Sequence, residues 1–336
     1  MPSRELRRHS KLALRVRCRS VRILSQAEVR EHLDPVALIS DLEAAFRDRF
    51  SEIIIPTRMH LSLADGLFLI MPCYDRVGGA LGMKLVTVQN HPQESGERVQ
   101  ATLLLFDPQT GSPRLQMPAR YLTEVRTAAA SALATRILAR EDVATLGVFG
   151  AGRQASSHLR LLTKVRNFAR IMVCTRDSAR ARSFAQQMSL ELGLPVEPCD
   201  ATTCAASADV LCTCTTSPSP LFDGNALRPG THLNVVGAFQ PHTREVDSIT
   251  VKRSAVAVDT YDGAFAEAGD LLLPLREGVI SRDHLQWDLH ELTKKTPFAR
   301  TSREQITLFK SVGTALEDLI AAEQIEQSLV RQVPSR

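Results

Sequence analysis

The hydrophobic positions of the chain follow two patterns, one before and one after about residue 144. In the first part, a helix-like stretch at residues 34–47 precedes short apolar runs at 67–71, 83–88 and 101–106, separated by Gly, Pro and Asn. Such punctuation predicts strands joined by hairpin-type turns. The alanine-rich residues 123–139 then favour a closely packed helix, since alanine has the highest helix propensity.

From residue 144 onward, short apolar runs alternate with amphipathic stretches. The runs lie at 144–149, 171–174, 210–214, 233–236 and 255–258, and the amphipathic stretches at 154–165 and 179–192. Continuous apolar runs are typical of strands buried on both faces, and intervening helices predict right-handed crossovers. We therefore predict an α/β protein with a doubly wound parallel sheet after an α+β part. The pattern also predicts a last helix over residues 302–327.

Composition and charge narrow the class of protein. With 336 residues, of which 44% are hydrophobic and 23% charged, the chain is typical of a soluble globular protein. No apolar run approaches the roughly 18 residues of a membrane span, so we expect no membrane partner. The net charge of +4 comes from residues 1–22, which hold eight basic residues and one acid; the remaining 33 basic and 36 acidic residues give −3. Nucleic-acid binding is therefore not predicted, and residues 1–20 are a basic extension, either a transit peptide, an inert segment or the result of an early start codon.

Seven cysteines show neither a CxxC pair nor a regular spacing with histidine. This pattern predicts no metal site, and the thiols are expected to act as small hydrophobic side chains. We therefore expect a reducing compartment, the cytoplasm.

A glycine-rich turn, Gly150-Ala-Gly-Arg-Gln-Ala155, joins the predicted strand at 144–149 to the helix that follows. Gly150 permits a tight turn, Gly152 permits close approach of a pyrophosphate, and Ala155 permits close packing of helix and strand. The free N–H groups of the helix N-terminus add an anion site. The turn predicts that residues 131–311 form a dinucleotide-binding Rossmann domain.

The second strand of this domain ends at Thr175-Arg176-Asp177. NAD enzymes usually place an acid here to bind the ribose 2′-hydroxyl. Arg176 would suit a 2′-phosphate instead, so NADP(H) is favoured. Asp177 leaves binding of NAD(H) open. A third interpretation is that Arg176 is a solvated loop residue that contacts neither cofactor.

Seven short segments stand out between residues 21 and 329. They are Ile55-Pro-Thr-Arg58, Gly82-Met-Lys84, Asn90-His-Pro92, Glu124-Val-Arg126-Thr-Ala-Ala-Ala, the glycine turn, Asn234-Val-Val-Gly-Ala238 and Lys310-Ser-Val-Gly313. In this order they resemble the motifs of the ornithine cyclodeaminase/μ-crystallin family. The resemblance implies a substrate-binding and dimerisation domain (residues 21–130 plus 312–330), the Rossmann domain, and a homodimer.

The resemblance also implies the site residues. Arg58, Lys84 and Arg126 would bind a substrate carboxylate, with Lys84 and Arg126 as catalytic residues, since guanidinium and ammonium groups pair with carboxylates. Taken singly, each could be a solvated or snorkelling side chain. Cofactor contacts would come from Thr102, Gly150, Ala151, Gly152, Arg153, Gln154, Thr175, Arg176, Thr215, Val236, Gly237, Ala238 and Ser311, the last at the start of the final helix. For Thr215 and Ser311, ordinary packing roles stay open.

Two departures from the family pattern bear on the reaction. Cyclodeaminases carry acids at the positions of Phe239 and Leu69, and neither side chain here can transfer a proton. The sequence therefore looks more like the branch that reduces Δ1-pyrroline-2-carboxylate to L-proline or Δ1-piperideine-2-carboxylate to L-pipecolate, with Phe239 against the ring. The imine proton would come with the substrate, from Lys84 or from His242. The alternatives are an ornithine cyclodeaminase, an alanine-dehydrogenase-like oxidoreductase, and a non-catalytic NADP(H)-binding protein.

Overall fold

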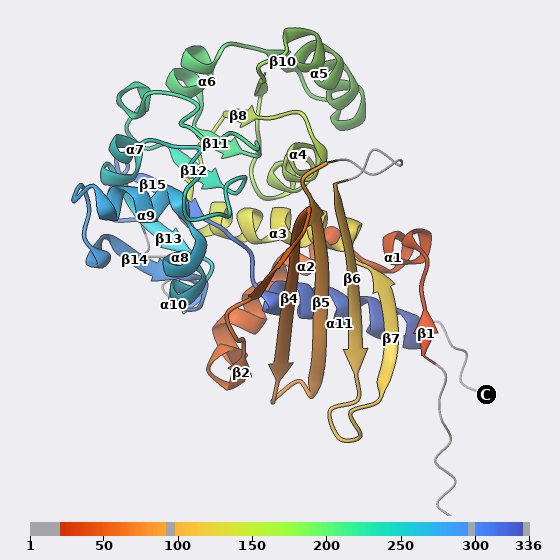
Figure 1. Ribbon diagram of the computed structural model, residues 1–336. Helices are drawn as coiled ribbons and strands as arrows, with labels where there is room; N and C mark the ends of the chain where they lie inside the picture. Colours follow the sequence, from red (N-terminus) through yellow and green to blue (C-terminus); the bar gives the residue numbers. More distant parts are fainter. Residues whose placement is uncertain (1–20, 92–97, 295–299, 332–336) are drawn as a thin grey trace, which may run out of the picture.

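The computed structural model describes residues 21–91, 98–294 and 300–331 (Figure 1). Two sheets organise these residues, a mainly antiparallel sheet early in the chain and a parallel sheet later. The predicted basic extension, residues 1–20, lies outside the described residues.

The first sheet has the strand order β1-β7-β6-β5-β4-β2, and β3 also pairs with β4. Its strands are β1 (Arg22–Ile23), β2 (Ile53–Ile54), β3 (Met59–Leu63), β4 (Gly66–Asp75), β5 (Ala80–Gln89), β6 (Val99–Phe106) and β7 (Pro113–Pro118). The three predicted strands fall within β4, β5 and β6. Each of these observed strands is longer than the apolar run that predicted it. Buried and half-buried residues alternate along β4 and β5, so one face of this sheet is covered and the other is more open.

Helices cover the buried face of the first sheet. They are α1 (Gln26–His32), α2 (Pro35–Ala44) with a π-helical turn (Ala45–Arg49), α3 (Arg120–Leu138) and α11 (Ala315–Arg331). In Figure 1, α11 runs behind the strands, where it contacts β4 and β5. Helix α3 contacts β6 of the first sheet and β12 (His232–Val235) and β15 (Ile306–Lys310) of the second, so it joins the two sheets.

The second sheet has eight strands in the order β10-β9-β8-β11-β12-β15-β13-β14, and every neighbouring pair is parallel. Its other strands are β8 (Thr145–Phe149), β9 (Arg170–Cys174), β10 (Val196–Pro198), β11 (Val210–Thr213), β13 (Ser254–Val258) and β14 (Leu285–Asp288). The helices between them are α4 (Arg153–Val165), α5 (Ser178–Leu192), α6 (Ala201–Ser207), α7 (Ser248–Lys252), α8 (Tyr261–Glu267), α9 (Gly269–Arg276) and α10 (Leu289–Lys294). The predicted α/β class with a doubly wound parallel sheet is confirmed.

The predicted single helix over residues 302–327 is wrong. Residues 306–310 form β15, a fully buried strand between β12 and β13, and the helix α11 begins only at Ala315. The sequence Ile-Thr-Leu-Phe-Lys carries the β-branched and aromatic side chains that suit a buried strand. Gly313, at a φ of +79°, then turns the chain out of the parallel sheet towards α11.

Among the described residues, no helix combines the length and apolar character that crossing a membrane would require.

Candidate functional site

The glycine turn lies between β8 and α4. Gly150 has a φ of +113°, and a Cβ added there would lie 2.7 Å from the carbonyl oxygen of Cys214, so only glycine fits. Gly152 is the N-cap of α4, and a Cβ built on it would meet no heavy atom within 4 Å other than its chain neighbours. The helix N-terminus is therefore open to a phosphate group.

A cavity of about 350 Å³ lies next to this turn, between the two sheets. It is lined by the inner face of the antiparallel sheet, by α3, and by the loops that follow β11, β12 and β15. The predicted site residues that line it are Arg58, Lys84, Arg126, Arg153, Gln154, Thr215, Val236, Gly237, Phe239 and Ser311. The predicted site residues outside its lining are Thr102, Gly150, Ala151, Gly152, Thr175, Arg176 and Ala238.

Thr102 lies on the other face of the antiparallel sheet. It pairs with Leu85, whose neighbours Lys84 and Val86 both line the cavity. Successive residues of a strand point to opposite faces, so Thr102 faces away from the cavity of its own chain.

Two of the predicted carboxylate-binding cations form one buried cluster with acids of α11. Lys84 Nζ lies 2.6 Å from Asp318 Oδ2, and Arg126 Nε donates to Asp318 Oδ1 at 2.9 Å. Arg126 Nη1 also donates to Glu317 Oε2 at 2.7 Å. All four residues are at most 5% exposed. The cluster is therefore a set of paired charges shielded from water, with Lys84 and Arg126 on the cavity side.

Burial changes the acid strength of these groups. It lowers the pKa of Lys84 to about 8 and raises the pKa of Glu317 to about 7. Burial also opposes ionisation of Asp318, but Arg126 and Lys84 outweigh it and hold the pKa of this carboxyl below its usual value. Glu317 and Asp318 were not predicted from the sequence; their place four and five residues after the last glycine of the Lys-Ser-Val-Gly motif was the only signal.

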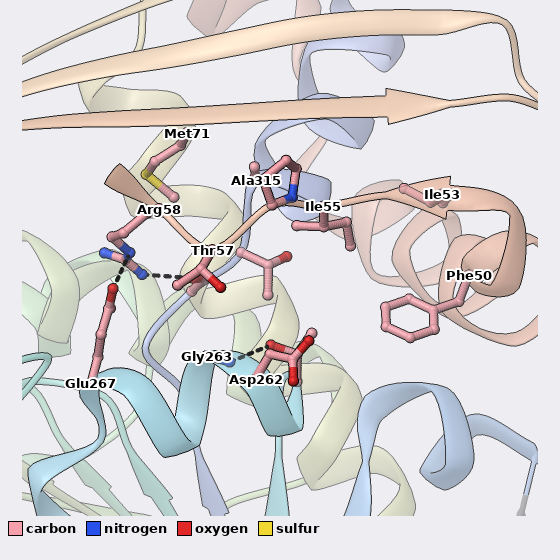
Figure 2. A pocket seen from close by; sticks show the side chains of 14 residues that line it. Phe50, Ile53, Ile55, Thr57, Arg58, Met71, Asp262, Gly263, Glu267 and Ala315 are labelled. Atoms are coloured by element: carbon pink, nitrogen blue, oxygen red, sulfur yellow. Dashed lines mark hydrogen bonds and ion pairs between the residues drawn. The ribbon is translucent and has the colours of Figure 1, made fainter. Parts of the chain in front are cut away.

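The third cation, Arg58, reaches the site from the segment between β2 and β3 (Figure 2). Its Nη2 donates to the carbonyl oxygens of Val312 and Gly313 at 2.6 and 2.8 Å. Its Nε lies 3.0 Å from Glu267 Oε1, an oxygen that His60 Nε2 also contacts at 3.0 Å. Arg58 thereby separates the main cavity from a smaller one of about 240 Å³, which Glu267 also lines.

The segment that receives Arg58 is held from the other side by Asp259, at the end of β13. One oxygen of this buried carboxylate, Oδ2, accepts from Ser311 Oγ at 3.1 Å and from the N–H groups of Val312 and Gly313 at 2.8 and 2.5 Å. Ser311 thus lines the cavity from the loop after β15, not from the start of α11 as predicted.

A second buried network supports the loops that follow β11 and β12, next to the glycine turn. Glu245 accepts from Thr213 Oγ1 and Gly237 N at 2.7 Å each, and from both N and Oγ1 of Thr215 at 2.7 Å. Burial raises the pKa of Glu245. Lys310 Nζ donates to the carbonyl of Ala238 at 2.5 Å and lies 2.8 Å from Asp270 Oδ2.

Asp270 completes this network, since its Oδ1 accepts from the N–H groups of Glu245 and Val246 at 2.6 and 3.1 Å. Glu245, Asp270 and Lys310 are each 0% exposed. Buried charges persist only when hydrogen-bonded partners compensate them. The partners here are largely the groups that shape the cavity at Thr215, Gly237 and Ala238.

The remaining lining is largely apolar. Leu69, Met71, Val86, Val88, Val99, Ala101 and Phe239 contribute side chains to it. Among the described residues that line the cavity, the one carboxylate is Glu124, which pairs with Arg153 at 3.0 Å. The positions of Leu69 and Phe239 therefore offer an apolar surface where a cyclodeaminase would carry acids.

Arg176 and Asp177 are exposed in the turn between β9 and α5. Asp177 Oδ1 caps α5 by accepting from the N–H groups of residues 179 and 180, and Thr175 Oγ1 donates to the Asp177 carbonyl at 2.6 Å. Arg180, which the sequence did not single out, donates to the Ala151 carbonyl of the glycine turn at 3.2 Å. Two arginines thus lie near the expected ribose position.

Comparison with known proteins identifies relatives in the family whose motifs the sequence resembles. The sequence model of the ornithine cyclodeaminase/mu-crystallin family matches residues 19–332. The chain is 32% identical over 316 residues to a Delta(1)-pyrroline-2-carboxylate reductase of Bacillus cereus, covering 92% of this chain and 97% of the relative. It is 34% identical over 319 residues to the ketimine reductase mu-crystallin of Rattus norvegicus, covering 92% and 98%.

Among solved structures, the fold is similar to Thermococcus litoralis Delta(1)-pyrroline-2-carboxylate reductase in complex with NADH and L-proline. The TM-score is 0.89 at 34% identity, and the match covers 93% of this chain and 98% of that one. The predicted resemblance is confirmed: the chain belongs to the ornithine cyclodeaminase/mu-crystallin family.

Proposed function

We propose that this protein is an NAD(P)H-dependent reductase of cyclic ketimine carboxylates, which converts Δ1-pyrroline-2-carboxylate to L-proline and accepts the six-membered Δ1-piperideine-2-carboxylate as a second substrate. One observation carries the proposal: Arg58, Lys84 and Arg126 come from separate elements and line one cavity together with apolar side chains and the nucleotide-side loops. A small ring with one carboxylate matches that combination. The named activities of the relatives in Bacillus cereus and Thermococcus litoralis support it.

The cavity fits a nicotinamide nucleotide. The glycine turn leaves the N-terminus of α4 open, and two buried oxygens in the lining, Thr123 Oγ1 and Gln154 Oε1, lack a hydrogen-bond partner among the residues that the structure describes. Buried polar atoms are normally satisfied, so a ligand is expected to supply their partners. When bound, the reduced nucleotide supplies the hydride that the imine carbon accepts.

The residues of the chain position the substrate and deliver charge. Arg126 and Arg58 present guanidinium groups for the carboxylate, and Lys84 adds a compact ammonium. Fixing the carboxylate also fixes the adjacent imine carbon, which lowers the entropic part of the barrier. Leu69 and Phe239 pack against the ring methylenes.

Reduction of C=N also requires one proton at nitrogen. We assign this proton to Lys84 when the substrate arrives as the neutral imine, because burial brings its pKa to about 8, within reach of neutral pH. Asp318, 2.6 Å away, stabilises the ammonium form before transfer. His242 is exposed and does not line the cavity, so the geometry does not favour it as donor.

We favour NADP(H) over NAD(H). One side-chain oxygen of Asp177, Oδ1, is engaged at the cap of α5, while Arg176 and Arg180 supply positive charge for a 2′-phosphate. The double variant R176A/R180A is expected to lose the preference for NADPH while its kcat with NADH stays within about twofold.

A homodimer is also proposed, through the open face of the antiparallel sheet. Phe68, Ile70, Met83, Leu85 and Leu104 are half-buried on that face of β4, β5 and β6, opposite the face that α11 covers. Contiguous apolar surface of this kind marks protein interfaces. Sedimentation should give a dimer for the native chain and a monomer for M83D; a native monomer would contradict the proposal.

A substrate panel tests the main proposal. The full chain is assayed with cyclic imine carboxylates, with pyruvate plus ammonia, and with ornithine, each with NADPH and NADH. Oxidation of NADPH with the cyclic imine carboxylates, but not with pyruvate plus ammonia or with ornithine, supports the proposal. Turnover of pyruvate plus ammonia, release of proline from ornithine, or tight nucleotide binding without any turnover would each replace it with one of the alternatives.

A further inference from the structure

Two thiols and one imidazole meet directly behind the nucleotide side of the cavity. Cys212 is on β11, Cys214 follows the end of that strand, and His158 is on α4. The sulfur atoms are 3.5 Å apart, and one ring nitrogen and both sulfurs all lie within 4.8 Å of one another. Residues two apart in an extended chain share a face, so both thiols point towards the helix. Among the described residues, this is the one group of three such side chains close enough to share an ion.

The imidazole is arranged as in a metal ligand. His158 Nδ1 lies 2.8 Å from the carbonyl oxygen of Gln154, which can only accept, so in the neutral ring Nδ1 carries the proton. The lone pair is then on Nε2, which accepts from Ser131 Oγ at 2.9 Å. Histidines that bind metals commonly donate their second N–H to a carbonyl or carboxylate in this way.

We propose that His158, Cys212 and Cys214 form a binding site for one thiophilic divalent cation of the Zn²⁺ class, and that its occupancy weakens nucleotide binding. Two thiolates and a neutral imidazole balance the charge of a divalent ion, which matters because His158 and Cys212 are fully buried. The ion displaces one proton from each thiol, both protons pass to solvent, and nothing is oxidised or reduced. A water molecule or Ser131 Oγ would complete four-coordination.

The link to the nucleotide runs through Cys214. Its N–H donates to the carbonyl of Phe149 at 2.8 Å, and its own carbonyl lies against Gly150 in the glycine turn. Cys214 and Gln154 both line the cavity. Two Zn–S bonds of about 2.3 Å at a tetrahedral angle require sulfurs roughly 3.8 Å apart, so an ion would move both sulfurs from their present 3.5 Å separation. That movement shifts the backbone on which the glycine turn rests.

The test uses the reduced, metal-free full chain and Cd²⁺ as the probe, because thiolate-to-cadmium bonds absorb in the near ultraviolet. We expect the native chain to bind one equivalent of Cd²⁺ with this absorption, and Zn²⁺ to displace it. C212A/C214A should lose the absorption, and H158Q should bind about tenfold more weakly. The control C204A removes another buried thiol, on α6, and should bind like the native chain.

Nucleotide affinity is measured in parallel by NADPH fluorescence. One equivalent of Zn²⁺ should weaken NADPH binding at least tenfold in the native chain and in C204A, and leave C212A/C214A unchanged. Equal Cd²⁺ binding by native chain and C212A/C214A, or no stoichiometric binding by the native chain, overturns the site; stoichiometric binding with unchanged NADPH affinity overturns the inhibitory role. No step needs turnover, so the outcome is independent of the proposed reductase activity.

Discussion

The two walls of the cavity place their charges in opposite ways. On the cation wall, formed by Arg58, Lys84 and Arg126, the cations face the cavity and the acids of α11 lie behind two of them. On the loop wall, formed by the segments after β11, β12 and β15, the charged residues Glu245, Asp270 and Lys310 lie behind backbone that faces the cavity. The first arrangement recognises charge in a ligand, whereas the second fixes the shape of the backbone around one.

The largest expected effect is on the cation wall. R126M should lower kcat/KM for the cyclic imine by roughly 10³-fold, because it removes a carboxylate-binding group, leaves the buried Glu317 without its partner and leaves Asp318 paired with Lys84 alone. Steady-state kinetics together with NADPH titration measures the effect. The comparison predicts NADPH affinity within about twofold of the native value; an equal loss of NADPH affinity would show that the two walls are not separate.

The loop wall should respond the other way. E245Q retains an acceptor oxygen but replaces the second one by an amide donor, so about half of its four hydrogen bonds to Thr213, Thr215 and Gly237 are lost. We expect NADPH to bind about tenfold more weakly and the unfolding temperature to fall, with the KM for the imine changed less. Calorimetry and fluorescence titration check this. A change in imine KM without a change in NADPH affinity would contradict the role given to the loop wall.

Replacing Asp318, the acid that pairs with Lys84, should shift the pH dependence of kcat/KM. The ammonium of Lys84 is lost as pH rises through its pKa of about 8, so kcat/KM should fall on the alkaline side of that value. Asp318 raises that pKa, and D318N therefore shifts the alkaline limb to lower pH. Rates from pH 6 to 10 measure the shift; a limb that stays in place would exclude Lys84 as its origin.

The smallest expected effect concerns protons taken up on binding. Glu317 has a pKa raised to about 7, and a substrate carboxylate bound at Arg126 adds negative charge near it, which raises the pKa further. Binding at pH 7.5 should therefore take up a fraction of a proton, seen by calorimetry in buffers of different ionisation enthalpy. E317Q should reduce the uptake to the share of Lys84, whose pKa of about 8 the bound carboxylate also raises, and binding of NADPH alone should not show it.

The sequence predicted those parts of the site that short motifs specify. The glycine turn requires three small residues in six positions, and the three cations occur in motifs, so both could be found. Glu245, Asp259 and Asp270 could not, because a buried acid looks like a surface acid until the fold shows its partners. Strand β15 could not be predicted, because Ile306–Lys310 leads directly into a helical pattern and only its position in the sheet shows that all five residues are buried.

The cysteine and histidine cluster shows the same limit. His158 is 54 positions before Cys212, so no spacing rule applies, and the sequence predicted no metal site. The three side chains meet because α4 packs on the same face of the sheet that Cys212 and Cys214 share. Contacts between helix and sheet, rather than motifs, create this group.

The position of β15 has a consequence for synthesis of the protein. This strand is made after all seven of its companions, yet it pairs with β12 on one side and β13 on the other. While the chain is still emerging from the ribosome, β12 and β13 therefore each present an unpaired edge to their surroundings. The parallel sheet can be completed only when residues 306–310 have left the exit tunnel. A ribosome that stalls before these residues would leave a chain with two unpaired strand edges, prone to aggregation, in the centre of its larger sheet.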